Sequence, residues 1–324
     1  MNREHEPVLP ADRHQLLRGH LMSEIDQENA PRRSPARRYG WVALPALAGG
    51  LALVMVLGGG GSGEVPERPP VAAGPLGTPS ASAQPVPEPV QLLDRIAQVA
   101  AAKPAQEVKD HQFVYVKSVN RFPDYWKNVM VPGTLREREA WHSVDGKKAG
   151  LLYEPGLFRP GVDPGVKPDG TMELDTNTSP NVNSPTYRYL AALPTDPKVL
   201  LQKMIDEKSG KEHTPQSAFG VIGDLLREQI APPEVTAALY RAAGLIEGVQ
   251  LIDDVADARG RHGVAVGLTV QDVRLEWVFD RGTSEFLGER QVVVKEGSRG
   301  KPGDVIAETA VLTRAVVDKA GDRP

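Results

Sequence analysis

The sequence of 324 residues contains no cysteine. Without thiols, the chain cannot form a disulfide, a thiolate metal site, a cysteine nucleophile or a lipid anchor attached through cysteine. It also lacks an excess of charge, because 38 basic residues stand against 42 acidic ones and the net charge is −4. A chain this close to neutrality has no broad positive field, so nucleic acid is not expected as a partner.

The motifs of common enzyme classes are missing as well. The sequence has no P-loop, no H-E-x-x-H and no G-x-S-x-G. The acidic groups Asp253-Asp254 with Asp257, and Asp163, Asp169 and Asp175, could serve acid–base chemistry or hold Ca²⁺, but turns also collect Asp because it bonds its own backbone. The sequence predicts no catalytic residue, no cofactor and no metal ligand.

One long stretch has no charged side chain. It runs from Tyr39 to Gly63, and its apolar part is Trp41 to Leu57. Seventeen helical residues cover about 26 Å, close to the hydrocarbon thickness of a bilayer, and Gly58 to Gly61 could extend them. We therefore expect residues 39–61 to form a single transmembrane helix, through which the chain contacts the lipid bilayer.

The flanking charges predict the orientation of this helix. Four arginines precede it and one basic residue follows it before Gln91; the four are Arg32, Arg33, Arg37 and Arg38. The positive-inside rule then makes residues 1–38 a short cytoplasmic head and places the remainder outside the cell membrane. A cleaved signal peptide is the alternative, but the one candidate cleavage site, Ala81-Ser82-Ala83, lies about 24 residues beyond the apolar run.

The region that follows is rich in proline. Residues 62–89 combine proline with Ala, Ser and Gly and contain too few apolar residues for a core, so we expect a disordered, extended linker. The folded, extracytoplasmic domain is predicted over residues 90–318, and residues 319–324 are expected to be a short tail.

Apolar spacing within the domain predicts both helices and strands. Thr195 or Asp196 is expected to cap a helix that starts at Pro197, and residues 155–185 are expected to be a loop over the surface. The other helices are expected from Val90 onward and over Gln216–Ile230 and Pro233–Leu245. The strands are expected over Gln112–Val119, Leu135–Val144, Ala149–Tyr153, Val249–Val255, Val264–Val270, Val273–Phe279, Glu285–Val294 and Val305–Val317.

Short turns between consecutive strands are typical of an antiparallel meander. The predicted fold class is therefore α+β: a curved antiparallel sheet, half-barrel-like, with helices packed on one side and a single transmembrane helix in front. The few aromatic residues gather in the strands. Tyr115, Trp141 and Trp277 are the candidates to face a ligand, since an apolar concave face either packs a helix or holds a lipid-like molecule.

Several of these features together resemble a known family. The head carries Arg13-His14 followed by Leu16-Leu17, and the exterior domain carries Leu193-Pro-Thr-Asp-Pro197 with Leu200-Leu201 after it. In this arrangement the chain resembles an actinobacterial family of single-pass membrane proteins with no assigned activity, often encoded beside extracytoplasmic-function sigma factors. Its exterior domain is also similar to the sheet fold of lipoprotein carriers and sigma regulators.

The resemblance carries no catalytic residues to this sequence. It implies a membrane-anchored extracytoplasmic binding or sensor module that is non-enzymatic and accessory to sigma-factor regulation, and it names no envelope ligand or protein partner. Two alternatives stay open, namely a membrane-tethered lipid or lipopeptide carrier and, less favoured, a cell-wall hydrolase.

Overall fold

The computed structural model describes residues 87–126, 129–131, 133–158, 165–208 and 213–324. The predicted head, the predicted transmembrane helix and nearly all of the predicted linker lie outside these residues. Within the described ranges, no helix is both long enough and apolar enough to cross a membrane.

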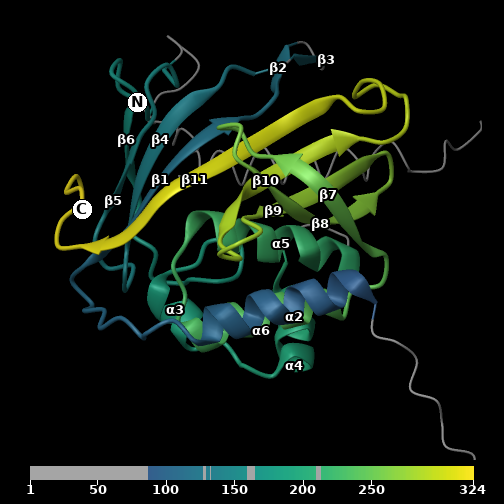
Figure 1. The fold of residues 1–324 in the computed structure, drawn as a ribbon. Coiled ribbons are helices and arrows are strands. Elements are labelled where there is room, and N and C mark those ends of the chain that lie inside the picture. Colours follow the sequence, from purple (N-terminus) through teal and green to yellow (C-terminus); the bar gives the residue numbers. More distant parts are fainter. Residues whose placement is uncertain (1–86, 127–128, 132, 159–164, 209–212) are drawn as a thin grey trace, which may run out of the picture. The chain divides into compact units, whose positions relative to one another are not determined.

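The described residues form an α+β fold built on a large antiparallel sheet (Figure 1). Nine strands make up this sheet: β1 Phe113–Arg121, β4 Arg136–Ser143, β5 Gly150–Tyr153, β6 Thr171–Leu174, β7 Val249–Ala256, β8 His262–Val270, β9 Val273–Phe279, β10 Phe286–Val293 and β11 Val305–Val317. Their order is β6-β5-β4-β1-β11-β10-β9-β8-β7. A separate hairpin pairs β2 Asp124–Trp126 with β3 Val129–Val131.

The predicted antiparallel meander is confirmed for β7 to β11, because each of these strands pairs with the next one along the chain. The centre of the sheet is assembled differently. Strand β1 lies between β4 and β11, so Tyr115 stands opposite Trp141 on one side and Ala315 on the other. This pairing joins the start and the end of the domain.

The stretch over residues 155–185 is more than a surface loop. Strand β6 forms within it and extends the sheet beyond β5, with Leu152 opposite Met172. The turn before β6 needs Gly170, whose φ is +89°, while Asp169 accepts a hydrogen bond from the backbone N–H of Thr171. The strand is short and largely polar, so its sequence lacks the alternation that identifies a strand.

The helices lie together on one side of the sheet, as predicted (Figure 1). They are α2 Glu88–Ala101, α3 Tyr187–Ala191, α4 Pro197–Glu207, α5 Pro215–Glu228 and α6 Pro233–Gly244. Asp196 caps α4 by accepting from the backbone N–H groups of Lys198 and Val199, and Thr214 caps α5 through a reciprocal pair of bonds with Ser217. Helix α3 was not predicted from the sequence, because it has only one turn and a half.

The main core lies between this helical layer and the sheet. Helix α5 packs directly on β8 and β10, and α2 pairs with α6. The side chains that fill the interface are large and fully buried, among them Leu93, Phe219 and Ile222 from the helices and Trp277 from β9. Smaller apolar clusters lie on the opposite face of the sheet.

The sheet also curls at the end of the β7–β8 hairpin. The backbone N–H of Ala258 at the hairpin tip donates to the carbonyl of Thr309 in β11, 3.3 Å away. Arg261 donates to the carbonyls of Leu287 and Val311. These bonds bring the tip of the hairpin across the opposite face onto the centre of the sheet.

Candidate functional site

The three candidate aromatic residues do not form one site. Trp277 lies on the helix-covered face, is 0% exposed and stacks on Phe219 with ring centroids 3.8 Å apart. A Cβ on Gly223 in α5 would come within 2.6 Å of the indole Nε1 of Trp277 and would also collide with Glu289. The helix therefore rests directly on this tryptophan, and Trp277 packs the core instead of facing a ligand.

Glu289 stands opposite Trp277, and a series of charged side chains runs from it past the end of α5 to β4. Arg227 holds Glu228 at 3.0 Å and Glu289 at 3.5 Å, and Arg138 also donates to Glu228. Burial would raise the pKa of Glu228, but Arg138 and Arg227 outweigh it and lower that pKa well below its usual range. We call Arg138, Glu154, Arg227, Glu228 and Glu289 the buried charge cluster.

A small hollow adjoins the buried charge cluster. Phe122, Arg227 and Glu289 are among the residues that line it, and the guanidinium of Arg227 lies 5.4 Å from the centre of the Phe122 ring. The volume of the hollow is about 10 Å³, which is enough for about one water molecule. This hollow has no room for an acyl chain.

Tyr115 and Trp141 lie together on the opposite face of the sheet. Their ring centroids are 5.2 Å apart, and the C-terminal residues of the chain cover them. The indole Nε1 of Trp141 donates to the backbone carbonyl of Asp322 at 2.6 Å, and the guanidinium of Arg323 lies 5.8 Å from the centre of the Trp141 rings. Both rings are thus buried by a segment of the same chain.

A carboxylate completes this surface. Glu139 precedes Trp141 by two residues in β4, so both side chains are on the same face. Its Oε2 accepts from the hydroxyl of Tyr115 at 2.7 Å and from Nε of Arg323 at 2.7 Å, while its Oε1 accepts from Nη2 of Arg323 at 3.2 Å. The side chain of Glu139 is 8% exposed and that of Arg323 is 59% exposed.

The pKa values follow from these contacts. Burial would raise the pKa of Glu139, but the bonds from Arg323 and Tyr115 hold it below its usual range. Burial and the bond to Glu139 raise the pKa of Tyr115, so its hydroxyl stays protonated as a donor. The bond to Glu139 raises the pKa of Arg323. We call the surface formed by Tyr115, Glu139 and Trp141, with the half-buried Leu151 and Tyr153, the tail surface.

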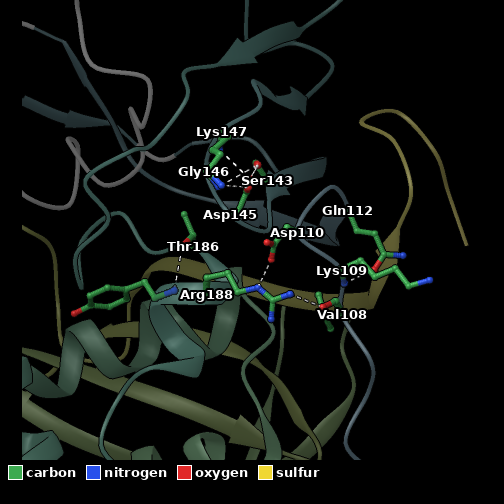
Figure 2. A network of polar contacts seen from close by, with 11 residues as sticks. Val108, Lys109, Asp110, Gln112, Ser143, Asp145, Gly146, Lys147, Thr186 and Arg188 are labelled. Carbon is green, nitrogen blue, oxygen red and sulfur yellow. Dashed lines mark hydrogen bonds and ion pairs between the residues drawn. The ribbon is translucent and has the colours of Figure 1, made fainter.

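The start of the tail is fixed by the chain that enters β1. Gln112 accepts from the backbone N–H of Lys109 and donates to the carboxylate of Asp318, the first residue after β11. Figure 2 shows the contacts around this entry segment, in which Arg188 of α3 reaches Asp110 and the carbonyl of Val108. The tail therefore starts from a defined position beside β1.

The turn between β4 and β5 is closed by a second group of contacts in Figure 2. The hydroxyl of Ser143 accepts from the backbone N–H of Gly146, and Asp145 accepts from that of Lys147. Gly146 has φ +76°, and a Cβ there would also collide with the backbone carbonyl of Asn177. This turn fixes the pairing of the two strands that carry Trp141 and Leu151.

The acidic groups singled out in the sequence do not converge. Asp253 pairs with Arg281 and Asp254 with His262, both at the surface, whereas Asp257 is buried and accepts three bonds within its own turn. Asp163 lies outside the described residues. Among the residues that the structure describes, no group of three or more His, Asp or Glu side chains could hold a metal ion.

Sequence reasoning missed Glu139 in the tail surface and Arg323 in the tail that covers it. Glu139 could have been found, because it shares the strand face of Trp141 and β4 pairs with the strand of Tyr115. Arg323 gave no signal, since a lone arginine before a terminal proline has no local pattern. No family model and no curated protein matches this chain.

Proposed function

We propose that this chain is a membrane-anchored, extracytoplasmic binding module without enzymatic activity, and that the tail surface is where it binds. The observation that carries the binding proposal is the buried Glu139 carboxylate, which accepts from Arg323 on the strand face where the indole of Trp141 bonds Asp322. A buried charge is costly unless it is paired, so a surface that holds one suits a ligand that brings the opposite charge.

The membrane part of the proposal rests on the sequence. The uncharged run over residues 39–61, with arginines before it and a proline-rich stretch after it, supports a single transmembrane helix and an outside position for the domain. Helix α2 begins at Glu88, where the proline-rich stretch ends, which fits a tether followed directly by a folded domain. We also propose that the antiparallel sheet is curved into a half-barrel-like shape.

The lipid-carrier alternative has less support. A carrier of this architecture needs an open space between helices and sheet, but Trp277, Phe219 and the buried charge cluster fill that interface where the structure describes it. Charged side chains also make a poor lining for an acyl chain. An accessory role in sigma-factor regulation would add a contact between residues 1–38 and a sigma or anti-sigma factor. A pull-down with that segment as bait would detect this partner.

The topology can be tested with single cysteines, because the chain has none of its own. Lys301 is exposed in the β10–β11 turn, and Glu24 lies in the predicted head. In intact cells, a membrane-impermeant maleimide should label Lys301→Cys, while Glu24→Cys should react only after lysis. Labelling of Glu24→Cys in intact cells, or no labelling of Lys301→Cys until lysis, would contradict the membrane-anchored, extracytoplasmic part of the proposal.

A further inference from the structure

We propose that the tail surface binds peptide segments that carry an arginine, and that residues 319–324 are its built-in competitor. The proposal rests on the binding function above and names its ligand class and its regulation. The C-terminal residues show how such a ligand is held, because they already occupy the surface.

The surface has two features that suit a guanidinium. Glu139 receives two N–H groups of Arg323, at 2.7 and 3.2 Å, and the ring of Trp141 lies 5.8 Å from the guanidinium carbon. A planar guanidinium can donate two bonds along its edge while its weakly hydrated face covers an aromatic ring. A lysine ammonium has the same charge but cannot donate the paired bonds, so the surface distinguishes arginine from lysine.

The surface also recognises the backbone of its occupant. The indole of Trp141 donates to the backbone carbonyl of Asp322, so this hydrogen bond does not involve the side chain of Asp322. Pro324 follows the arginine and restricts Arg323 to extended conformations. The tail reaches this position through a turn, in which the backbone N–H of Asp322 donates to the carbonyl of Lys319 and Gly321 has φ +94°. Recognition therefore needs an arginine and the carbonyl before it, which segments of other proteins can supply.

The tail does not have the composition of a hydrophobic cover. A segment that served only to shield Tyr115 and Trp141 would bring apolar side chains, but this one brings Asp322 and Arg323 to the rings. A Cβ at Gly321 would stand 3.9 Å from Leu151 with nothing closer, so the tail leaves space there. The tail is held by charge and backbone contacts.

These contacts suit an occupant that can be displaced. The side chain of Arg323 is 59% exposed, and an ion pair with an exposed partner contributes little stability. The tail competes chiefly because it is tethered, which gives it an effective concentration on the order of millimolar. When it leaves, Tyr115 still donates to Glu139, so the carboxylate remains oriented for another guanidinium.

The test is a titration of the full-length chain and of a chain ending at Asp318. The probe is the acetylated hexapeptide with the sequence of residues 319–324, followed through the indole resonance of Trp141. We expect saturable binding to the shortened chain and binding at least about tenfold weaker to the full-length chain, whose tail competes. A hexapeptide with lysine in place of arginine should bind at least about fivefold more weakly.

Two variants keep the outcome interpretable. Arg323→Ala in the full-length chain should bind the peptide as the shortened chain does, and Glu139→Gln in the shortened chain should lose binding. The proposal fails if neither opened chain shifts on titration while the Trp277 resonance reports an intact core. It also fails if the arginine and lysine peptides bind equally. Maleimide labelling is a separate readout, so a failure of the proposed topology is recognised independently.

Discussion

The indole of Trp141 in β4 donates to the backbone carbonyl of Asp322, 181 positions later and two residues from the end of the chain. The arginine that follows pairs with Glu139, two residues before that tryptophan. A segment of six residues is thus held by one indole, one carboxylate and one aromatic face. The contacts that attach this segment can be removed by substitution without changing the main core between the helices and the sheet.

Replacing Arg323 with alanine should free the tail. The variant loses both bonds to Glu139, and we expect the backbone order parameter of Gly321 to fall from about 0.85 to below about 0.6. Asp322→Ala is the matched control, because Trp141 bonds the backbone carbonyl of that residue and the variant keeps it. Equal order parameters for the two variants would contradict the role assigned to Arg323. Nuclear magnetic resonance relaxation measures the order parameter of Gly321 in both variants.

Acid should release the tail as well. Because the pKa of Glu139 is lowered in the folded chain, the ion pair is complete above the usual pKa of 4.5 and is lost as the pH falls through the lowered value. The amide resonance of Gly321 should therefore move below about pH 4.5. Glu139→Gln should show no such step. The pKa of Glu228 is lowered too, so the Trp277 resonance must be followed to separate tail release from unfolding.

The buried charge cluster should be sensitive to the loss of one charge. Glu228→Gln leaves Arg138 and Arg227 without their shared carboxylate, and we expect the free energy of unfolding to fall by about 3 kcal/mol. Glu247→Gln is the same substitution at an exposed site and should change it by less than about 0.5 kcal/mol. Urea denaturation of the two variants measures the difference, and similar midpoints would contradict the assignment.

Helix α5 should not tolerate a side chain at Gly223. An alanine Cβ would meet Trp277 and Glu289, so Gly223→Ala should destabilise the fold by about 1–3 kcal/mol. Gly244 at the end of α6 provides the control, because a Cβ there would find Val90 at 3.6 Å and Leu93 at 3.8 Å, which are ordinary contacts. Gly244→Ala should leave the thermal midpoint unchanged or raise it. A lower thermal midpoint for Gly244→Ala than for Gly223→Ala would contradict this packing.

Most of the elements were predictable because their signals are local. Pro197 after Asp196 marks a helix start, and the alternation in Val273–Phe279 marks a strand; both are confirmed. Strand β6 and helix α3 escaped because they are short, and their positions depend on partners that bond them, such as β5 and the capping Thr186. The pairing of β1 with β11 joins residues as far apart in the chain as Phe113 and Val317, and no local pattern encodes it.

The candidate site was less predictable than the fold. The sequence directed attention to Trp141 and Trp277 alike, since both are strand tryptophans next to charge. What separates them is the face of the sheet: Trp277 meets Phe219 of α5, whereas Trp141 meets the tail. The side on which helices pack is a property of the assembled fold. For the same reason the role of Arg323 became visible only in three dimensions.

The exchange rate of the Trp141 indole proton with solvent tests the central claim most directly. The account predicts slow exchange in the full-length chain, where Asp322 accepts that proton, and an exchange at least about tenfold faster in a chain that ends at Asp318. Trp277 should exchange at the same rate in both chains. If the Trp141 proton exchanges equally fast with and without residues 319–324, the tail does not cover this surface and the account is contradicted.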